Sequence, residues 1–260
     1  MSTAVHEVYA IRYAHHERTA SENFLGGDPH DGPMPMDYFV WLVRGAGLDL
    51  VIDTGFNAAA AARRQRQLLR PVDEALALVG VDAAKVRDVV ITHLHYDHVG
   101  NFDLFPRATF HLQDLEMQFA TGRSMCHEPM RHAFDVEDVV GMVRNVYRGR
   151  VRFHAGDAQL FPGISVHLIG GHTMGLQVVR VATRRGQVVL ASDASHYYAN
   201  MGEGRPFPIV YNVGDMMEGW RKIGALADSP AHIVPGHDPL VLERYPAASE
   251  ALNGIVVRLD

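Results

Sequence analysis

The chain has 260 residues, of which 47% are hydrophobic, and a formal net charge of -6 when its histidines are neutral. This acidic balance offers no basic face to nucleic acid or to an anionic membrane, so we expect a small-molecule substrate as the partner. The sequence shows no export signal and no apolar segment of bilayer length, which predicts a cytoplasmic protein. No break in composition divides it, and we expect one domain over residues 1–260.

The predicted elements begin with β structure. Residues 7–13 alternate between apolar and polar side chains, as in a strand at the edge of a sheet. Residues 38–53 predict a hairpin that turns at residues 44–47. The intervening residues 21–36 are rich in Gly, Pro, Asp and Asn, which disfavours a helix or a strand. We therefore expect residues 15–36 to form a loop that covers a site or contacts a second subunit.

Helices and short strands alternate in the rest of the chain. Residues 58–70 are rich in alanine and predict a helix, a second helix is expected to start at Pro71, and a buried strand is predicted over residues 88–92. Further strands are predicted over residues 109–112, 164–169, 177–182, 188–191 and 232–235, and helices over residues 114–120, 135–144 and 215–227. This alternation, without a Gly-rich phosphate loop, favours a layered α/β sandwich of sheets flanked by helices.

The most informative segment of the sequence is THLHYDHVGN, residues 92–101, which ends the strand predicted at residues 88–92. In an extended backbone, residues two apart project to the same side, so His93 and His95 can converge on one ion. Asp97 and His98 follow at the turn and can bind a second ion. Imidazole and carboxylate are zinc ligands, and a chance cluster of exposed polar residues is the less favoured interpretation.

This segment resembles the HxHxDH signature of the metallo-β-lactamase superfamily. Other segments resemble further elements of that family, namely VIDTG at residues 51–55, GHTMG at 171–175, LASDA at 190–194 and PGHD at 235–238. The resemblance extends over nearly the whole chain. It implies an αββα metallo-β-lactamase sandwich, with the metals at one edge between the two sheets.

The resemblance also implies roles for individual residues. It assigns His93, His95 and His172 to one metal ion, Asp97, His98 and His237 to the other, and Asp193 to both as a bridge. Asp53 is expected to support these ligands from behind. Two divalent ions are implied, with zinc as the expected metal and iron, manganese or cobalt compatible with the same donors. A water shared by two such ions yields hydroxide at neutral pH, which would attack a lactone or ester carbonyl while Asp97 orients it or carries a proton.

Within the superfamily the chain most resembles the quorum-quenching N-acyl homoserine lactonases, in its length, in its motif spacing and in having aspartate rather than cysteine at position 193. Those lactonases carry a tyrosine three residues after the bridging aspartate, where this chain has His196. An imidazole can donate the hydrogen bond that a tyrosine donates, so His196 is predicted to act in catalysis. Tyr197 is the alternative for contact with the substrate, and a packing role stays open for it and for Tyr198.

The N-terminal loop departs from this group of lactonases. Its Phe24, Met34 and Met36 are predicted to line the substrate pocket, and a surface or subunit contact, compatible with a homodimer, is an equal alternative. The main alternative function is a catabolic hydrolase of an aromatic or heterocyclic lactone, ester or activated ether. A glyoxalase II-like thioesterase ranks lower, because no basic cluster near the C-terminus suits glutathione. An inactive metal-binding scaffold also ranks lower, because a scaffold has no need of a complete ligand set.

Overall fold

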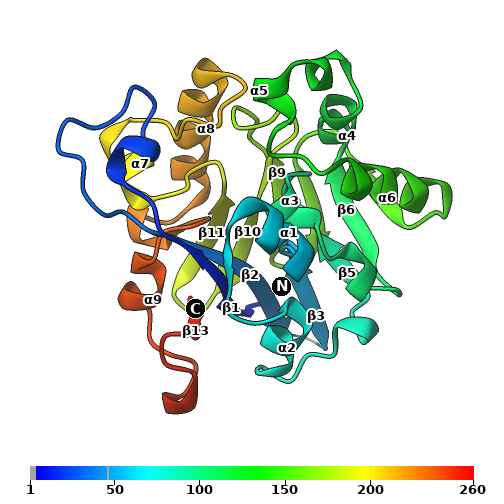
Figure 1. Ribbon diagram of the computed structural model, residues 1–260. Coiled ribbons are helices and arrows are strands. Elements are labelled where there is room, and N and C mark those ends of the chain that lie inside the picture. The colour runs from blue at the N-terminus through cyan, green and yellow to red at the C-terminus, as the bar shows by residue number, and fades with distance from the viewer. Residues whose placement is uncertain (1–3, 46) are drawn as a thin grey trace.

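The computed structural model describes residues 4–45 and 47–260, which build two β-sheets and the helices around them (Figure 1). The strands are β1 (Glu7–His16), β2 (Met36–Gly45), β3 (Leu48–Ile52), β4 (Gln67–Leu68), β5 (Asp88–Val90), β6 (Thr109–Gln113), β7 (Val151–His154), β8 (Ala158–Phe161), β9 (Ile164–Leu168), β10 (Gln177–Thr183), β11 (Gly186–Ser192), β12 (Ile233–Pro235) and β13 (Val256–Arg258). The α-helices are α1 (Ala58–Arg64), α2 (Val72–Ala77), α3 (Tyr96–Val99), α4 (Asp114–Ala120), α5 (Glu128–Arg131), α6 (Val136–Tyr147), α7 (Tyr198–Glu203), α8 (Val213–Leu226) and α9 (Leu240–Arg244).

Each sheet combines strands that are neighbours in the sequence with strands that lie far apart in it. The first sheet has the order β13-β1-β2-β3-β5-β6-β7, with β4 paired to β1, and the second has the order β12-β11-β10-β9-β8. The pairs β3·β5, β5·β6, β6·β7 and β11·β12 are parallel. Parallel neighbours end at the same edge of a sheet, so the loops that follow these strands gather in one region.

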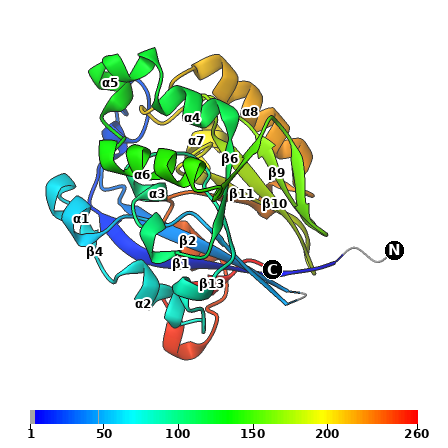
Figure 2. The ribbon, with the colours of Figure 1, turned by 90° about the vertical axis from the view of Figure 1, so that its right-hand side faces the viewer.

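Three buried apolar clusters lie between four layers. Trp41 of β2 packs with residues of β9, β10 and β11 in the cluster between the two sheets. Leu42, its neighbour on β2, belongs to a second cluster that includes α1, α2 and α6. Trp220 of α8 belongs to a third cluster, which lies between the outer face of the second sheet and α8. Figure 2 shows α8 along that face. The αββα sandwich that the sequence resemblance implied is therefore confirmed.

Strand β2 shows how the pattern of the sequence produces these layers. Its alternate residues Phe39, Trp41 and Val43 belong to the cluster between the sheets, whereas Val40 and Leu42 belong to the outer cluster. Successive side chains of a strand point to opposite faces, so a strand covered on both faces is apolar at every position. This explains the continuous apolar run in the sequence of β2.

Two predictions were wrong in part. The strand predicted over residues 7–13 forms as β1, but it is interior rather than at an edge, because β13, a short strand that we did not predict, pairs with its other side. The helix predicted over residues 58–70 ends at Arg64, because Gln65 adopts a left-handed conformation with φ of 56° and residues 67–68 pair with β1 instead. In both cases pairing between distant segments overrides the local pattern.

Most other predicted elements lie near their expected bounds. The hairpin of β2 and β3 is confirmed by its antiparallel register, although Ala46, in the predicted turn, lies outside the described residues. The helices predicted over residues 114–120, 135–144 and 215–227 correspond to α4, α6 and α8. Along the described chain, no helix combines the length and apolar character needed to cross a bilayer.

The segment predicted as a loop over residues 15–36 includes the end of β1 and the first residue of β2. Its middle part lies against α7 and the residues that follow it: Leu25 N donates to Pro206 O at 2.7 Å, and Asn200 Nδ2 donates to Asn23 O at 3.0 Å. Arg205 Nη1 pairs with Asp28 Oδ2 at 2.8 Å. The segment is thus anchored within its own chain.

Candidate metal centre

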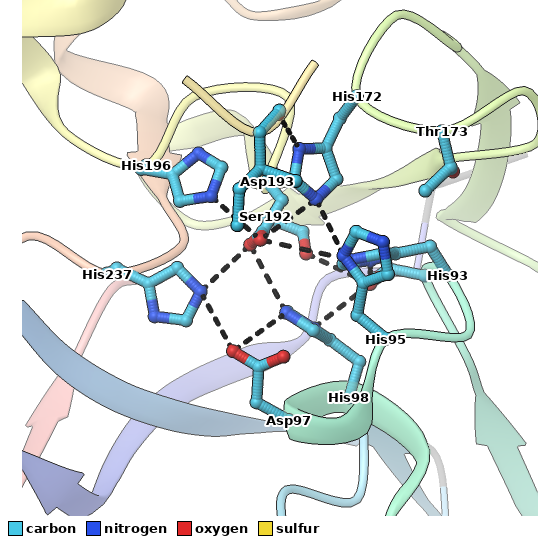
Figure 3. A network of polar contacts seen from close by, with 12 residues as sticks. His93, His95, Asp97, His98, His172, Thr173, Ser192, Asp193, His196 and His237 are labelled. Atoms are coloured by element: carbon cyan, nitrogen blue, oxygen red, sulfur yellow. Dashed lines mark hydrogen bonds and ion pairs between the residues drawn. The ribbon is translucent and has the colours of Figure 1, made fainter. Parts of the chain in front are cut away.

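Loops from both sheets bring a cluster of imidazole and carboxylate groups together (Figure 3). One source is the short loop between β5 and α3 together with α3 itself, and the others follow β9, β11 and β12. All of the clustered side chains are buried or nearly so: His93, His95, Asp97, His98, His172, Asp193, His196 and His237. Burial of this many polar groups requires partners for each of them.

Three imidazole nitrogens and one carboxylate oxygen form the first donor group. His95 Nδ1 lies 3.0 Å from His93 Nε2 and 3.0 Å from His172 Nε2. Asp193 Oδ2 lies 3.3 Å from His172 Nε2 and 3.8 Å from His93 Nε2. All four atoms lie within 4.8 Å of one another, and three histidines with a carboxylate are a suitable tetrahedral ligand set for zinc.

The second donor group lies on the other side of the Asp193 carboxylate. Asp193 Oδ1 is 3.0 Å from His237 Nε2 and 3.3 Å from His98 Nε2. Asp97 Oδ2 is 3.8 Å from both of these nitrogens. The two oxygens of Asp193 therefore face different donor groups, which is the arrangement that a carboxylate bridging two ions requires.

Contacts behind the rings fix the direction in which the imidazoles point. His98 Nδ1 lies 2.7 Å from Asp53 Oδ2, while His172 Nδ1 and His237 Nδ1 donate to the backbone oxygens of Ile209 and Asp37 at 2.7 and 2.9 Å. Such partners select the tautomer and leave Nε2 free to bind a metal. Asp53 accepts two further hydrogen bonds from Thr92, so it lies where a supporting residue was expected.

The cluster has the properties of a cation site. His98 Nε2 and Asp193 Oδ1 are buried and have no hydrogen-bond partner among the described residues. Burial, reinforced by the neighbouring imidazoles, holds the pKa values of His93 and His95 well below the usual range, so these rings are neutral. His95 Nδ1 lies 3.0 Å from two imidazole nitrogens, and one ring N–H cannot satisfy both contacts, so the residues present fit a divalent metal that takes their lone pairs.

His196 lies in the same cluster. Its Nε2 is 3.0 Å from Asp193 Oδ2, its ring stacks on Phe207 with centroids 3.7 Å apart, and its Nδ1 has no hydrogen-bond partner among the described residues. With Asp193 and His237 it forms a third group able to hold an ion. Tyr197, the alternative at this turn, points elsewhere: its hydroxyl is 3.3 Å from Pro35 O and 3.4 Å from Met34 O.

A cavity of about 230 Å³ opens onto the cluster. Among the residues predicted to contact substrate, Met36 and His196 lie in its wall, whereas Phe24, Met34 and Tyr197 do not belong to its described lining. Phe24 is buried beneath the Arg205 guanidinium, 4.0 Å from the ring centroid. The remaining wall is formed by five further residues of the cluster and by Arg18, Glu22, Tyr38, Arg64, Arg66, Tyr96, His132, Ala133, Phe207, Pro208 and Ile209.

Glu116 on α4 is a supporting residue that the sequence reasoning missed. It is fully buried, accepts a hydrogen bond from Leu94 N at 2.8 Å through Oε1, and accepts from Thr173 Oγ1 at 2.6 Å and Gly175 N at 3.1 Å through Oε2. Burial raises its pKa to about 7, although all three donors favour the ionised form. Glu116 thereby connects the loop of His93 and His95 with the loop of His172.

The sequence did contain one signal for this residue. Glu116 lies three positions before the buried Phe119, on the face of α4 that packs inward. A carboxylate on an apolar helix face needs buried donors, and this requirement marks a structural or functional contact. Gly175 belongs to the same contact, since a Cβ there would come within 2.1 Å of Glu116 N.

Comparison with known proteins agrees with this geometry. Residues 34–237 match the family model described as Metallo-beta-lactamase superfamily. The chain is 29% identical over 183 residues to the N-acyl homoserine lactonase AttM of Rhizobium johnstonii, an alignment that covers 69% of this chain and 68% of that relative.

Solved structures show the same fold. A quorum-quenching N-acyl homoserine lactone lactonase superposes with a TM-score of 0.75 at 20% identity, covering 92% of this chain and 94% of the other. An N-acyl homoserine lactone hydrolase, with the product N-hexanoyl-L-homoserine bound at its catalytic metal centre, superposes with a TM-score of 0.74 at 19% identity, covering 91% and 94%. At these identities the likeness concerns the fold.

Proposed function

The chain belongs to the metallo-β-lactamase superfamily and is a metal-dependent hydrolase, and on this premise we propose that it opens a lactone or ester with two divalent ions, zinc being the expected metal. The observation that carries the proposal is the Asp193 carboxylate, whose two oxygens face separate donor groups at 3.0 to 3.8 Å. The sequence similarity to the AttM lactonase supports a lactone of the N-acyl homoserine class.

We assign the metal ligands as the sequence predicted: His93, His95 and His172 for one ion, Asp97, His98 and His237 for the other, and Asp193 for both. When bound, such ions polarise a carbonyl and lower the pKa of a coordinated water. Asp53 and Glu116 hold the ligands in place from behind. Asp97, which lies in the cavity wall, is assigned to orient the nucleophile and to carry its proton to the leaving oxygen.

His196 is assigned to hydrogen bonding with the substrate. Its Nε2 lies 3.0 Å from Asp193 Oδ2, both residues line the cavity, and the flat stack on Phe207 fixes the plane of the ring. A carboxylate engaged by two cations has fewer lone pairs left for His196, so the Nε2 hydrogen becomes available to the carbonyl or leaving oxygen of a substrate. Substitution by glutamine, which keeps one donor, is expected to preserve more activity than substitution by alanine.

A second substrate class is favoured by the cavity itself. Its volume of about 230 Å³ is below the roughly 300–1,000 Å³ common for drug-sized ligands, and aromatic rings form part of its wall. Both features suit a compact aromatic or heterocyclic lactone or ester better than a long acyl chain. This keeps a catabolic hydrolase as the alternative to an acyl homoserine lactonase.

The test measures metal content per chain together with hydrolysis of short- and long-chain acyl homoserine lactones, an aromatic lactone and an aryl ester. Two metals with acyl homoserine lactone turnover, abolished by His95→Ala and retained by His154→Ala as a control outside the cluster, supports the lactonase. Activity confined to the aromatic compounds supports the alternative. A protein that binds no metal after loading contradicts both.

A further inference from the structure

Two guanidinium groups enter the cavity without a carboxylate partner among the described residues. Arg18 donates from Nε to Asn23 Oδ1 at 2.6 Å and from Nη2 to the backbone oxygen of Glu22 at 2.7 Å. Arg66 donates to the Tyr96 hydroxyl at 3.2 Å, to His16 Nε2 at 3.0 Å and to the Arg64 backbone oxygen at 2.6 Å. Neutral acceptors thus hold both groups in place without cancelling their charge.

Neighbouring charges do not supply the missing counter-ion. Arg63 and Arg64 share the carboxylate of Asp135, at 2.6 and 3.1 Å, so Asp135 is not available to Arg18 or Arg66. Glu17, adjacent to Arg18 in sequence, is exposed and contacts His15 Nε2 at 3.2 Å. Glu22, in the cavity wall, is also exposed, and its Oε2 accepts from Thr19 N at 2.8 Å. A positive charge in a partly buried site without a counter-ion is costly unless an anion joins it.

The two arginines belong to the same end of the cavity. Both guanidiniums lie close enough to His16 to disfavour its protonation. Burial and the positive charges of Arg66 and Arg18 lower the pKa of His16 to about 4, so its ring stays neutral. His16 Nε2 therefore acts as an acceptor for Arg66. An incoming anion at this end meets two cations and a neutral ring.

This end of the cavity lies one aromatic ring away from the metal cluster. Arg18 lies over the Phe207 ring at 5.3 Å, and Phe207 stacks on His196. On the other wall, the Tyr96 hydroxyl that contacts Arg66 is 3.4 Å from the Tyr38 hydroxyl, and the Tyr38 ring centroid is 5.0 Å from that of His237. A small molecule can therefore reach both ends.

We propose that Arg18 and Arg66 form an anion subsite that binds a carboxylate of the substrate, so that the preferred substrates are compact lactones or esters carrying a free carboxylate remote from the bond that is cleaved. The identity of the substrate rests on the proposed function, whereas the subsite itself rests on the two unpaired guanidiniums. Guanidinium groups present their donors in a fork that matches a carboxylate, which gives both affinity and orientation.

The kinetic test compares two aryl esters. One carries a free carboxylate, and in the other an uncharged carboxamide replaces that carboxylate while the ester bond is kept. The metal-loaded protein should show the lower KM for the carboxylate. Arg66→Gln and Arg18→Gln should each raise that KM about tenfold or more while leaving kcat and the KM of the amide little changed. The control is Arg63→Gln, an exposed arginine outside the cavity, which should behave as the unchanged protein. Equal KM values for both esters in all variants would overturn the subsite.

A binding measurement keeps the subsite testable if neither ester is hydrolysed, a result that counts against the proposed function alone. Calorimetric titration of the metal-loaded protein should show glutarate binding more tightly than butyrate, because one carboxylate of glutarate meets the metal end and the other the arginines. Arg66→Gln should remove this preference, and 0.5 M salt should weaken it. Equal affinity for glutarate and butyrate would refute the subsite, and tighter binding of inorganic phosphate than of glutarate would refute its assignment to a carboxylate.

Discussion

The two ends of the cavity are built in a similar way but suit ligands of opposite charge: the metal cluster suits a cation, and Arg18 and Arg66 suit an anion. At the metal end, His93 Nε2, His95 Nδ1 and Asp193 Oδ2 face one another. The rings of His98, His172 and His237 are held there by contacts of their Nδ1 atoms. At the other end, donors on Arg18 and Arg66 are held by neutral acceptors. In each case the protein orients the groups but leaves their charge or lone pairs unmatched. The comparison shows that one protein can orient a cation site and an anion site by the same means, namely by hydrogen bonds to the atoms that do not face the ligand.

The largest effect is expected from removing Asp193, the carboxylate assigned to bridge the two donor groups. Asp193→Ala should lower both metal content and hydrolysis, the latter by more than about a hundredfold, because both donor groups lose a shared ligand. Metal analysis and steady-state kinetics check this. Asp49→Asn, on the far hairpin, should leave both unchanged. An Asp193→Ala protein that keeps two metals and full activity would contradict the bridging assignment.

A contact behind the metal end should have the next largest effect. Asp53→Asn keeps the shape of the side chain but removes the charge that faces His98 Nδ1 at 2.7 Å. We expect metal affinity to fall by roughly 10–100-fold, since such partners set the tautomer of a ligand. Competition against a chelator measures this affinity. Asparagine keeps one acceptor oxygen, which can still accept from Thr92 N, and unchanged affinity would mean that this contact is sufficient to hold the loop.

A smaller effect, on stability, is expected from substituting Glu116, which supports the metal end. Glu116→Gln keeps one acceptor oxygen but replaces the other by an amide nitrogen, which cannot accept from Leu94 N or, in the opposite orientation, from Thr173 Oγ1 and Gly175 N. The free energy of unfolding should decrease by about 1–3 kcal/mol, the usual penalty for leaving a buried donor unpaired. Denaturant unfolding measures this change, and Glu137→Gln on the exposed start of α6 is the control. A loss confined to activity, with stability intact, would show that Glu116 serves the chemistry alone.

The smallest expected effect concerns the arginine end and its dependence on pH. The pKa of His16 in the folded protein is lowered from 6.5 to about 4 by burial and by Arg66 and Arg18, so between these values the unfolded chain binds more protons. His16 therefore contributes stability that is present above pH 6.5 and is lost as the pH falls towards 4. Because the ring is partly exposed, the contribution should be below about 1 kcal/mol. His16→Gln should flatten this part of the curve of unfolding free energy against pH; an identical curve would show that His16 does not respond to the arginines.

The sequence predicted the metal end better than the arginine end, for a physical reason. His93, His95, Asp97 and His98 lie within six residues, and strand geometry alone brings the first two together. Among the supports, Asp53 was expected only from the family resemblance. The others could not be foreseen, because Glu116 reaches Thr173 across 57 positions and Asp37 reaches His237 across 200. Spacing in the sequence carries no information on such contacts.

The same limit applies to Arg66. The sequence predicted a helix through this position, basic on one side. Pairing of residues 67–68 with β1 ends the helix at Arg64 and turns Arg66 towards His16 and Tyr96. One left-handed residue, Gln65, therefore changes an apparent surface charge into part of the cavity wall.

The metal ligands come from both sheets, and this has a consequence for assembly. Those between His93 and His98 follow a strand of the first sheet, whereas His172, Asp193 and His237 follow strands of the second. Sliding one sheet along the other by a single residue, about 3.3 Å, is as large as the separations between the donor atoms themselves. A misaligned sandwich would therefore separate the proposed ligands, so metal binding would report on the correct docking of the two sheets.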